Sequence, residues 1–392
     1  MTSPPPVSGR GGRAFREAPR DRAARCPPVQ HQLRATPDTC FWGFFDSSRP
    51  PVLEVRSGDL VRVETLTHQA GDAPDLLMDA GVEAVYRGIP RAERGPGVHI
   101  MTGPIRVAEA EPGDTLEVRL LAMEPRLPYG TNIAAWWGYL YEDFGKERIT
   151  IYHVDMAAGL ARAAFAFDYT TTPRYDQPGI VVPSDEAARR PALSNVVVPL
   201  RPHLGVGGVA PREAGRINSI PPGAFGGNID NWRFGPGAAM YYPVFHRGAL
   251  YYLGDPHMAE GDAELSGTVI EASANVLVEL RVRKDIPVAA PVLETPTHWI
   301  THGFDEDLNR AMKAAARALL DLLVTRHGLS RDDAYSLISV AADFAVTQVV
   351  DMRQGVHGMI AKRVFLPPER SERTSIAGER RATTSRSDAS MS

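Results

Sequence analysis

The sequence predicts an α+β protein that is predominantly β, with a β-sandwich or barrel-like body and a C-terminal α/β segment containing two helices. From His31 to about Val292, short runs of alternating apolar and polar residues are separated by turns, which is typical of strands. The 392 residues include 35 Gly and 33 Pro, which is high for a helical protein. After residue 305 the apolar spacing lengthens to three or four, so helices follow the strands.

The two ends of the chain differ in composition from its middle. Residues 1–29 are rich in Pro, Arg, Gly and Ala, and we expect a disordered leader there. Residues 368–392 are similarly polar and predict a disordered tail. Between them we expect a β-rich catalytic body over 30–292 and the C-terminal α/β segment over 293–367.

Two stretches of the body carry hairpin signals. PVLEVR and LVRVET are alternating runs on either side of SGD, and GPIRVAEAEPGDTLEVRL has the same form around a Pro-Gly-Asp turn. We interpret the likeness of SGDLVRVE and PGDTLEVR as repeated hairpin chemistry rather than a duplication. A third alternating run, over residues 275–282, closes the β region.

Two amphipathic helices are predicted near the C-terminal end. The first runs from Asp305 to His327, with Asp305 as N-cap and Gly328 as the stop, and its apolar stripe is Leu308, Met312, Ala315, Leu319 and Leu322. The second begins at Ser330, with Asp333 in its first turn, and carries Tyr335, Leu337, Ile338, Ala341, Phe344 and Ala345. We interpret these stripes as core packing rather than as a cofactor site.

Composition argues against several classes of function. The formal net charge is −4 with no basic stripe, so the sequence does not favour nucleic-acid binding. No apolar run is long enough to span a membrane, and no apolar stretch follows the N-terminal arginines as a signal peptide requires. Cys26 and Cys40 form no CxxC pattern, which argues against a disulfide framework or a cysteine zinc site. We therefore expect a cytoplasmic protein.

The segment LGDPHMAEGDAELSGTVIE, residues 253–271, is the richest in groups that bind cations or activate water. It brings together six of them, namely Asp255, His257, Glu260, Asp262, Glu264 and Glu271. Its glycines and Pro256 favour turns over helix. The alternative is a solvated acidic loop before a strand. The apolar flanks LYYL and TVI favour a buried position between two strands, where charges need partners or ligands.

Two glycine-rich segments are candidates for ligand contacts. GGNIDN at 226–231 presents Asn228, Asp230 and Asn231 from a tight turn, although an Asx turn would explain the same residues. HLGVGGVAP at 203–211 lacks both the GxGxxG spacing and the Lys of a P-loop. Its glycines instead suit close backbone approach to a small ligand, with His203 as a polar contact.

Two further histidines lie next to predicted strands. His68 follows a strand beside Asp72 and Asp75, and His99 precedes IMTGPI. A lone histidine is more often a packing residue than a ligand, so both interpretations stay open. The sequence contains neither a GxSxG nor an HExxH motif. A hydrolytic reaction would therefore use an activated water as its nucleophile.

Five separated blocks resemble the acetamidase/formamidase family, in the family's order and over about residues 31–366. They are FWGFFDSSRPPVLEVRSGD, HIMTGPIRVAEAEPGD, GRINSIPPGAFGGNIDN, YYPVFHRGALYYLGDPHMAEGDAELSGTVIE and DDAYSLISVAADFAVTQVVD. The resemblance implies hydrolysis of a short aliphatic amide to carboxylate and ammonia on a β-rich fold. It also implies a bound divalent metal and a homo-oligomer, a dimer or higher.

The resemblance also assigns residues by position. Asp255, His257, Asp262 and Glu264 match the pattern GD-x-H-x-x-x-GD-x-E, while Asn228 and Asp230 match GGN-x-D, and His99 matches the His before TGPI. The chain departs from the pattern twice. Ala263 replaces the usual Gly before the last Glu, and Glu260 replaces a Gln, which adds negative charge that bears on metal or substrate preference.

The hypothesis from the sequence is a metal-dependent amide hydrolase. Asp255, His257 and His68 would bind the ion, which we expect to be Zn, with Ca as the alternative. Glu264 would be the general base, with Asp262 and His257 also catalytic. Asn228, Asp230, His203 and His99 would contact a small neutral amide. Two alternatives are a non-catalytic small-molecule-binding protein on the same β scaffold and a metal-stabilised structural protein.

Overall fold

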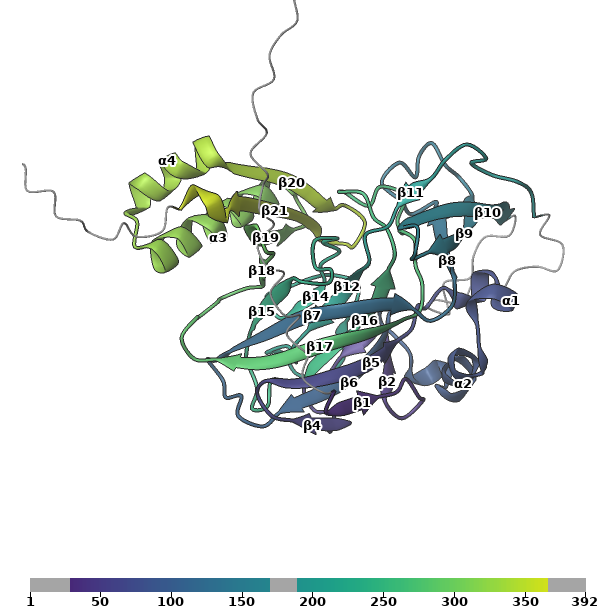
Figure 1. The fold of residues 1–392 in the computed structure, drawn as a ribbon, viewed down its shortest axis with the longest axis horizontal. Helices are drawn as coiled ribbons and strands as arrows, with labels where there is room; N and C mark the ends of the chain where they lie inside the picture. Colours follow the sequence, from purple (N-terminus) through teal and green to yellow (C-terminus); the bar gives the residue numbers. More distant parts are fainter. Residues whose placement is uncertain (1–28, 170–188, 366–392) are drawn as a thin grey trace, which may run out of the picture.

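The structure is a computed structural model that describes residues 29–169 and 189–365, and it confirms the predominantly β fold class (Figure 1). The predicted leader, up to residue 28, and the predicted tail lie outside the described residues. Strands fill most of the body, and helices α3 and α4 lie together at one end of the molecule, far from α1 and α2.

The largest element is a nine-stranded sheet that joins the body to the C-terminal segment. Its strands run in spatial order as β1 His31–Leu33, β5 Asp59–Thr65, β17 Ala274–Arg283, β7 Thr115–Pro125, β15 Ala239–Pro243, β18 Val292–Glu294, β19 His298–Asp305, β21 Gln354–Ala361 and β20 Ala342–Gln348. Because β15 pairs with β18, the C-terminal strands continue the sheet of the body.

A second sheet faces the first across the main hydrophobic core. It consists of β14 Gly226–Asn228, β12 His203–Gly208, β16 Tyr251–His257, β6 Ile100–Val107 and β2 Cys40–Trp42, with β4 Leu53–Val55 also paired to β6. Val63 and Val278 from the first sheet pack in one core with Ile105, Val206 and Leu253 from the second. Burial of apolar surface from both sheets is what stabilises this layered body.

Smaller elements complete the described part of the chain. A four-stranded sheet contains β11 Val198–Pro199, β10 Leu160–Tyr169, β9 Glu147–Asp155 and β8 Tyr129–Ala134, and β3 Phe44–Phe45 pairs with β13 Ile217–Asn218. The sequence pattern predicted only strands between His31 and Val292. The structure places helices α1 Pro74–Leu77 and α2 Ala80–Gly88 there, along with 3-10 turns η1 Ala70–Asp72 and η2 Arg91–Glu93.

Both predicted hairpins are wrong, for one shared reason. β4 pairs with β6, whereas β5 pairs with β1 and β17. In the second case β6 joins β16, β2 and β4, whereas β7 joins β17 and β15. Each turn therefore carries the chain from one sheet to the other. Alternation shows that each run buries one face, but it does not specify the strand with which the run pairs.

The two predicted helices are present, with corrections at their ends. α3 spans Leu308–His327 and ends at Gly328, whose φ of 66° is favourable for glycine. Its N-cap is Asp307 rather than Asp305, since the Asp307 carboxylate accepts from the Arg310 amide. Ala315 and Leu319 are buried as predicted, but Met312 is exposed.

The second helix, α4, spans Arg331–Ala341, and Ser330 caps it by accepting from the Asp333 amide. Phe344 and Ala345 belong to β20 and not to this helix. α3 packs against β19 and β21, and the remaining 3-10 turn, η3, spans Lys362–Val364. None of the helices in the described ranges combines the length and hydropathy needed to cross a bilayer.

Candidate active site

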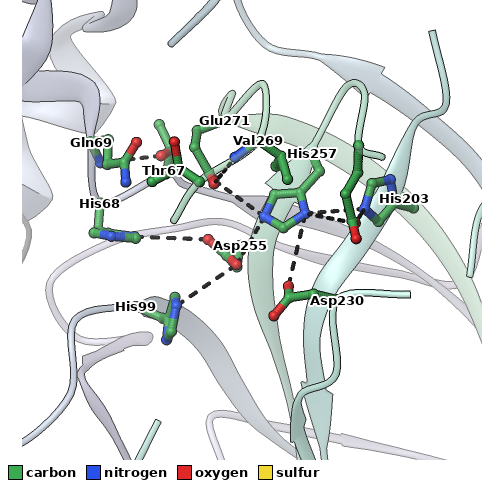
Figure 2. Close-up of polar contacts among 12 residues, drawn as sticks. Thr67, His68, Gln69, His99, His203, Asp230, Asp255, His257, Val269 and Glu271 are labelled. Atoms are coloured by element: carbon green, nitrogen blue, oxygen red, sulfur yellow. Dashed lines mark hydrogen bonds and ion pairs between the residues drawn. The ribbon is translucent and has the colours of Figure 1, made fainter. Parts of the chain in front are cut away.

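The candidate site is centred on the end of strand β16. Asp255 and His257 lie on this strand, rather than in a loop between strands, and both are almost completely buried. β12 runs antiparallel beside it, so that His203 lies opposite His257 in the register. The imidazole Nδ1 of His257 is 3.1 Å from Nε2 of His203 (Figure 2).

Gly205 on β12 gives these side chains their space. A Cβ at this position would clash with the His257 ring and would lie 2.5 Å from Asp230 Oδ1 and 2.7 Å from Asp255 Oδ2. The glycine therefore lets two strands and the turn after β14 bring their polar side chains together. The glycine-rich sequence predicted such close approach toward a ligand, and in the structure the groups that approach Gly205 are the candidate site residues themselves.

Asp255 is surrounded by three imidazoles. Its Oδ2 is 3.0 Å from His257 Nε2 and 3.8 Å from His99 Nε2, and its Oδ1 is 3.8 Å from His68 Nδ1 (Figure 2). The two longer distances exceed those of hydrogen bonds. Nδ1 of His99 lies 2.9 Å from the Ser219 hydroxyl, which fixes the ring and leaves Nε2 facing Asp255. We call this group, His68, His99, His257 and Asp255, the histidine side of the centre.

His257 also contacts carboxylates on its other edges. Its Nε2 is 3.2 Å from Glu271 Oε2, and its Nδ1 is 3.9 Å from Glu260 Oε2 and 4.0 Å from Asp230 Oδ1. Glu260 Oε2 in turn lies 2.6 Å from His203 Nε2. The other nitrogen of His203 lies 2.6 Å from the Arg201 carbonyl oxygen, to which it can donate, so this ring is fixed at both nitrogens. His203 is therefore part of a buried network rather than an open contact.

Two further carboxylates lie beside Asp230 on the flank away from His257. Oxygen atoms of Asp230, Glu264 and Asp351 lie within 4.8 Å of one another, and all three side chains are buried. Among the described residues, no Lys or Arg forms an ion pair with any of these three carboxylates. We call this group the carboxylate side of the centre.

Burial and charge shift the pKa values of the two sides differently. Burial alone would raise the pKa of Asp255, but His257 and His99 lower it well below its ordinary value. Burial and the neighbouring imidazole of His99 lower the pKa of His68 to about 3. Burial alone would lower the pKa of His257, but Glu271 and Asp255 raise it well above its ordinary value.

On the carboxylate side, burial and mutual repulsion act in the same direction. Burial, together with the charges of Asp351 and Glu260, raises the pKa of Glu264 well above its ordinary value. Burial and the charge of Glu264 do the same for Asp230. The pKa of Asp351 rises to about 8, chiefly through burial. Carboxyls in this arrangement bind protons more tightly than isolated carboxyls, and a bound cation would lower their pKa values again.

The donor atoms fit a divalent cation. Four sets of three buried residues each bring their ligand atoms within 4.8 Å of one another. Asp255 belongs to two of these sets, one with His68 and His99 and the other with Asp230 and His257. Buried oxygens of Asp255, Asp230, Glu264, Glu271 and Asp351 have no hydrogen-bond partner among the described residues. Buried polar atoms without partners are costly, and a bound cation would satisfy them.

Most of the residues predicted from the sequence lie in this centre, but Asp262 does not. One connected set of short distances joins His68, His99, His203, Asp230, Asp255, His257 and Glu264. Asn228 is buried on β14, and its Oδ1 has no partner among the described residues. Asp262 instead pairs with Arg233 at 2.8 and 3.0 Å, and its side chain is 35% exposed.

The structure brings three acidic residues to the centre to which the sequence pattern assigned no specific role. Glu271 lies in the acidic segment already noted, and Asp351 ends the last of the five blocks, so the resemblance alone could have indicated both. Asp72, noted only as a neighbour of His68, accepts a hydrogen bond from the Thr131 hydroxyl at 2.6 Å. Burial, and to a smaller extent the charges of Glu147 and Glu271, raise the pKa of Asp72 to about 8.

Fold and centre together define a β-rich protein with a buried imidazole and carboxylate site, the kind of site that metal-dependent hydrolases use. The model of the Acetamidase/Formamidase family matches residues 45–216 and 212–367. The chain belongs to this family, which confirms the resemblance inferred from the five blocks.

Individual relatives agree with this membership. The acetamidase of Mycolicibacterium smegmatis is 29% identical over 43% of this chain, and the aligned region spans only 49% of that relative. The formamidase of Methylophilus methylotrophus is 24% identical over 77% of this chain and 84% of its own length.

Solved structures show the same fold. A predicted acetamidase/formamidase from Thermoanaerobacter tengcongensis has a TM-score of 0.66 at 25% identity, covering 85% of this chain and 96% of its own. An acetamidase from Bacillus halodurans gives a TM-score of 0.66 at 26% identity, covering 85% of this chain and 98% of its own.

Proposed function

We propose that the protein hydrolyses a short aliphatic amide, of the size of formamide or acetamide, to a carboxylate and ammonia. The observation that supports this most strongly is the meeting of the two sides of the centre at His257 and Asp230, which are 4.0 Å apart. One side offers imidazoles and an ionised carboxylate for binding a cation. The other offers carboxyls that can accept and return protons near neutral pH.

A divalent ion would be held on the histidine side. Asp255, His257 and His68 are the proposed ligands, and His99 joins them because its Nε2 faces the same carboxylate. Such an ion supplies Lewis acidity, which makes a water more acidic and an amide carbonyl more electrophilic. The imidazoles favour Zn, whereas the number of oxygen donors would also accept Ca.

Glu264 is the proposed general base. Its Oε2 is buried and has no hydrogen-bond partner among the described residues, so it is available to accept a proton from the attacking water. The elevated pKa of Glu264, caused by burial and then by Asp351 and Glu260, makes it a stronger base than an ordinary carboxylate. As the C–N bond breaks, the same group returns the proton to the leaving nitrogen, which departs as ammonia.

Asn228 and Asp230 are proposed to orient the amide group. Asn228 Oδ1 and both carboxylate oxygens of Asp230 are buried acceptors without hydrogen-bond partners among the described residues. An amide NH2 has two hydrogens to donate and would satisfy acceptors of this kind. His203 is assigned a supporting part, because it holds Glu260 beside His257.

We also propose that the protein is a cytoplasmic homo-oligomer, a dimer or higher. Exposed apolar side chains at Tyr139, Leu140, Tyr141 and Phe144, close together in sequence, support self-association. Light scattering coupled to size-exclusion chromatography measures the subunit number directly.

The decisive experiment is ammonia release from a panel of short amides, measured before and after treatment with a chelator and after return of Zn or Ca. We expect turnover of at least one amide, lost on chelation and restored by one of the metals. Binding of amides without ammonia release would favour the binding-protein alternative. Bound metal without either binding or turnover would favour a structural role.

A further inference from the structure

Residues 260–264, which present Glu264 to the centre, adopt an unusual backbone conformation. Ala263 has a φ of 86° and Glu264 a φ of 50°, so two successive non-glycine residues lie in the left-handed region. L-amino acids other than Gly, Asn and Asp rarely adopt this conformation, because Cβ approaches the following carbonyl group. Other contacts must hold these residues in place.

Several side chains fix this segment from outside the centre. Arg233 donates two hydrogen bonds to the Asp262 carboxylate, at 2.8 and 3.0 Å, and Trp232 Nε1 donates a third at 2.8 Å. Arg201 Nη1 donates to the Glu260 carbonyl oxygen at 3.1 Å. The guanidinium groups of Arg201 and Arg233 both lie over the Trp232 ring, 4.2 and 4.1 Å from its centroid. The Ala263 amide also donates to the Thr347 carbonyl at 2.9 Å.

The ion pair joins the two segments that carry like charges. Asp230 and Arg233 belong to one turn, and Asp262 and Glu264 belong to the other. When they are ionised, the neighbouring carboxylates of Asp230 and Glu264 repel one another and push these two segments apart. The Arg233–Asp262 pair ties the same two segments together a few residues away. Arg233 is well placed for this, since only 12% of its side chain is exposed.

We propose that Arg233 and Asp262 are positioning residues, whose ion pair holds Ala263 and Glu264 in the left-handed conformation that directs the Glu264 carboxylate into the centre. This inference rests on the proposed role of Glu264 as general base. It assigns Asp262 to the support of catalysis and not to the chemistry itself. It also gives Ala263 a defined part, as the residue whose backbone strain the ion pair offsets.

The first test compares Arg233→Gln with Arg247→Gln in the full chain. Arg247 forms an ion pair with Glu111 on the surface, and its side chain is 72% exposed, so it is a matched control. We expect Arg233→Gln to lower kcat about a hundredfold, since small misplacement of a catalytic group has effects of that size, with KM and metal content nearly unchanged. Arg233→Lys, which keeps the charge without the paired contacts, should fall between. Equal kcat values for the two Gln variants would overturn the proposal.

The second test asks whether glycine at position 263 restores activity. In the Arg233→Gln background, Ala263→Gly should recover about a tenth or more of wild-type kcat, because glycine adopts the left-handed conformation at little cost. A merely structural Arg233 would predict no recovery. If Arg233→Gln does not fold, Asp262→Asn replaces it, since Asn keeps the size and an acceptor for Trp232. If Asp262 were itself a catalytic carboxylate, glycine at position 263 could not restore activity to Asp262→Asn. Failure of Ala263→Gly to restore activity in a folded variant would therefore contradict the positioning role.

The melting temperature separates this inference from the proposed function. Ala263→Gly should raise the Tm of the wild-type chain by roughly 1–3 °C and raise that of Arg233→Gln by less, because a released segment no longer carries the strain. This difference is measurable even if no amide is hydrolysed. Absence of turnover in the wild type would therefore contradict the proposed role of Glu264 as general base. Equal Tm shifts in both backgrounds would contradict the positioning role of the Arg233–Asp262 ion pair.

Discussion

The two sides of the centre are equally buried but have opposite electrostatic character. On the histidine side, Asp255 is held ionised because imidazoles outweigh the burial that would raise its pKa. On the carboxylate side, burial and like charges raise the pKa values of Asp230, Glu264 and Asp351 together. The difference shows that the neighbours of a buried carboxyl, more than its burial, decide whether it serves as an ionised ligand or as a proton carrier.

The largest effect should come from removing the histidine side. His257→Ala removes an imidazole that contacts Asp255, Glu271 and Glu260, so we expect loss of bound divalent metal and of measurable ammonia release. Elemental analysis of the purified wild type and variant measures this directly. Equal metal content in the two proteins would show that His257 is not a metal ligand. No metal in the wild type would contradict the proposed metal-dependent mechanism.

A smaller loss should follow a change on the carboxylate side. Asp351→Asn keeps the shape of the side chain but removes one of the charges that raise the pKa of Glu264. We expect kcat to fall roughly 10- to 100-fold and its acid limb to shift to lower pH, because Glu264 then titrates lower. A pH–rate profile of the folded variant provides the measurement. An acid limb at the wild-type position would mean that Asp351 does not act on the base.

Damage to the helical layer should affect stability but not chemistry. Leu319 is fully buried on α3, so Leu319→Ala should lower the free energy of unfolding by about 2–5 kcal/mol. Arg317 is exposed on the same helix, and its Ala variant should lose about 0.5 kcal/mol or less. Denaturant unfolding gives both values. Unchanged kcat per folded molecule in both variants would show that stability and catalysis are separable here, whereas a fall in kcat in the folded Leu319 variant would link α3 to the centre.

The last prediction concerns the pH dependence of stability and Asp72, which is buried. Its folded-state pKa of about 8 exceeds the ordinary value of 3.8, so the folded chain binds this proton more tightly than the unfolded chain. The stability from Asp72 is complete below pH 4 and is lost as pH rises to about 8, by at most about 1.4 kcal/mol per pH unit. Asp72→Asn should therefore flatten the dependence of Tm on pH between 5 and 8. An unchanged slope of Tm against pH would show that a group other than Asp72 titrates in this range.

The sequence predicted the content of the fold better than its connections. Alternating runs identified β5, β6, β7 and β17 as strands, but both hairpins were wrong because each turn crosses between sheets. Periodicity located α3 and α4, and Gly328 and Ser330 marked a helix end and start correctly. Pairing depends on partners distant in sequence, such as β17 beside both β5 and β7, and local patterns carry no information on them.

The candidate site was predictable where its residues are close in sequence. Asp255, His257 and Glu264 share one segment, and Asn228 and Asp230 share another, so their chemistry could be inferred locally. Asp351 is a lone carboxylate more than eighty positions away, and only folding brings it to Glu264. The Asp262 side chain points away from the centre because it pairs with Arg233 and Trp232. Residue spacing in the sequence does not predict this pairing.

The central claim, that the carboxylate side moves protons while the histidine side holds the ion, is tested most directly by Glu264→Gln. Gln keeps the size of the side chain but cannot accept the proton as a carboxylate does. The measurement combines kcat, metal content and folding of the variant. We expect kcat on the best amide to fall by about two to four orders of magnitude, while metal content and folding stay unchanged. The claim would be contradicted if the variant kept more than about a tenth of wild-type kcat, or if it lost metal and activity together.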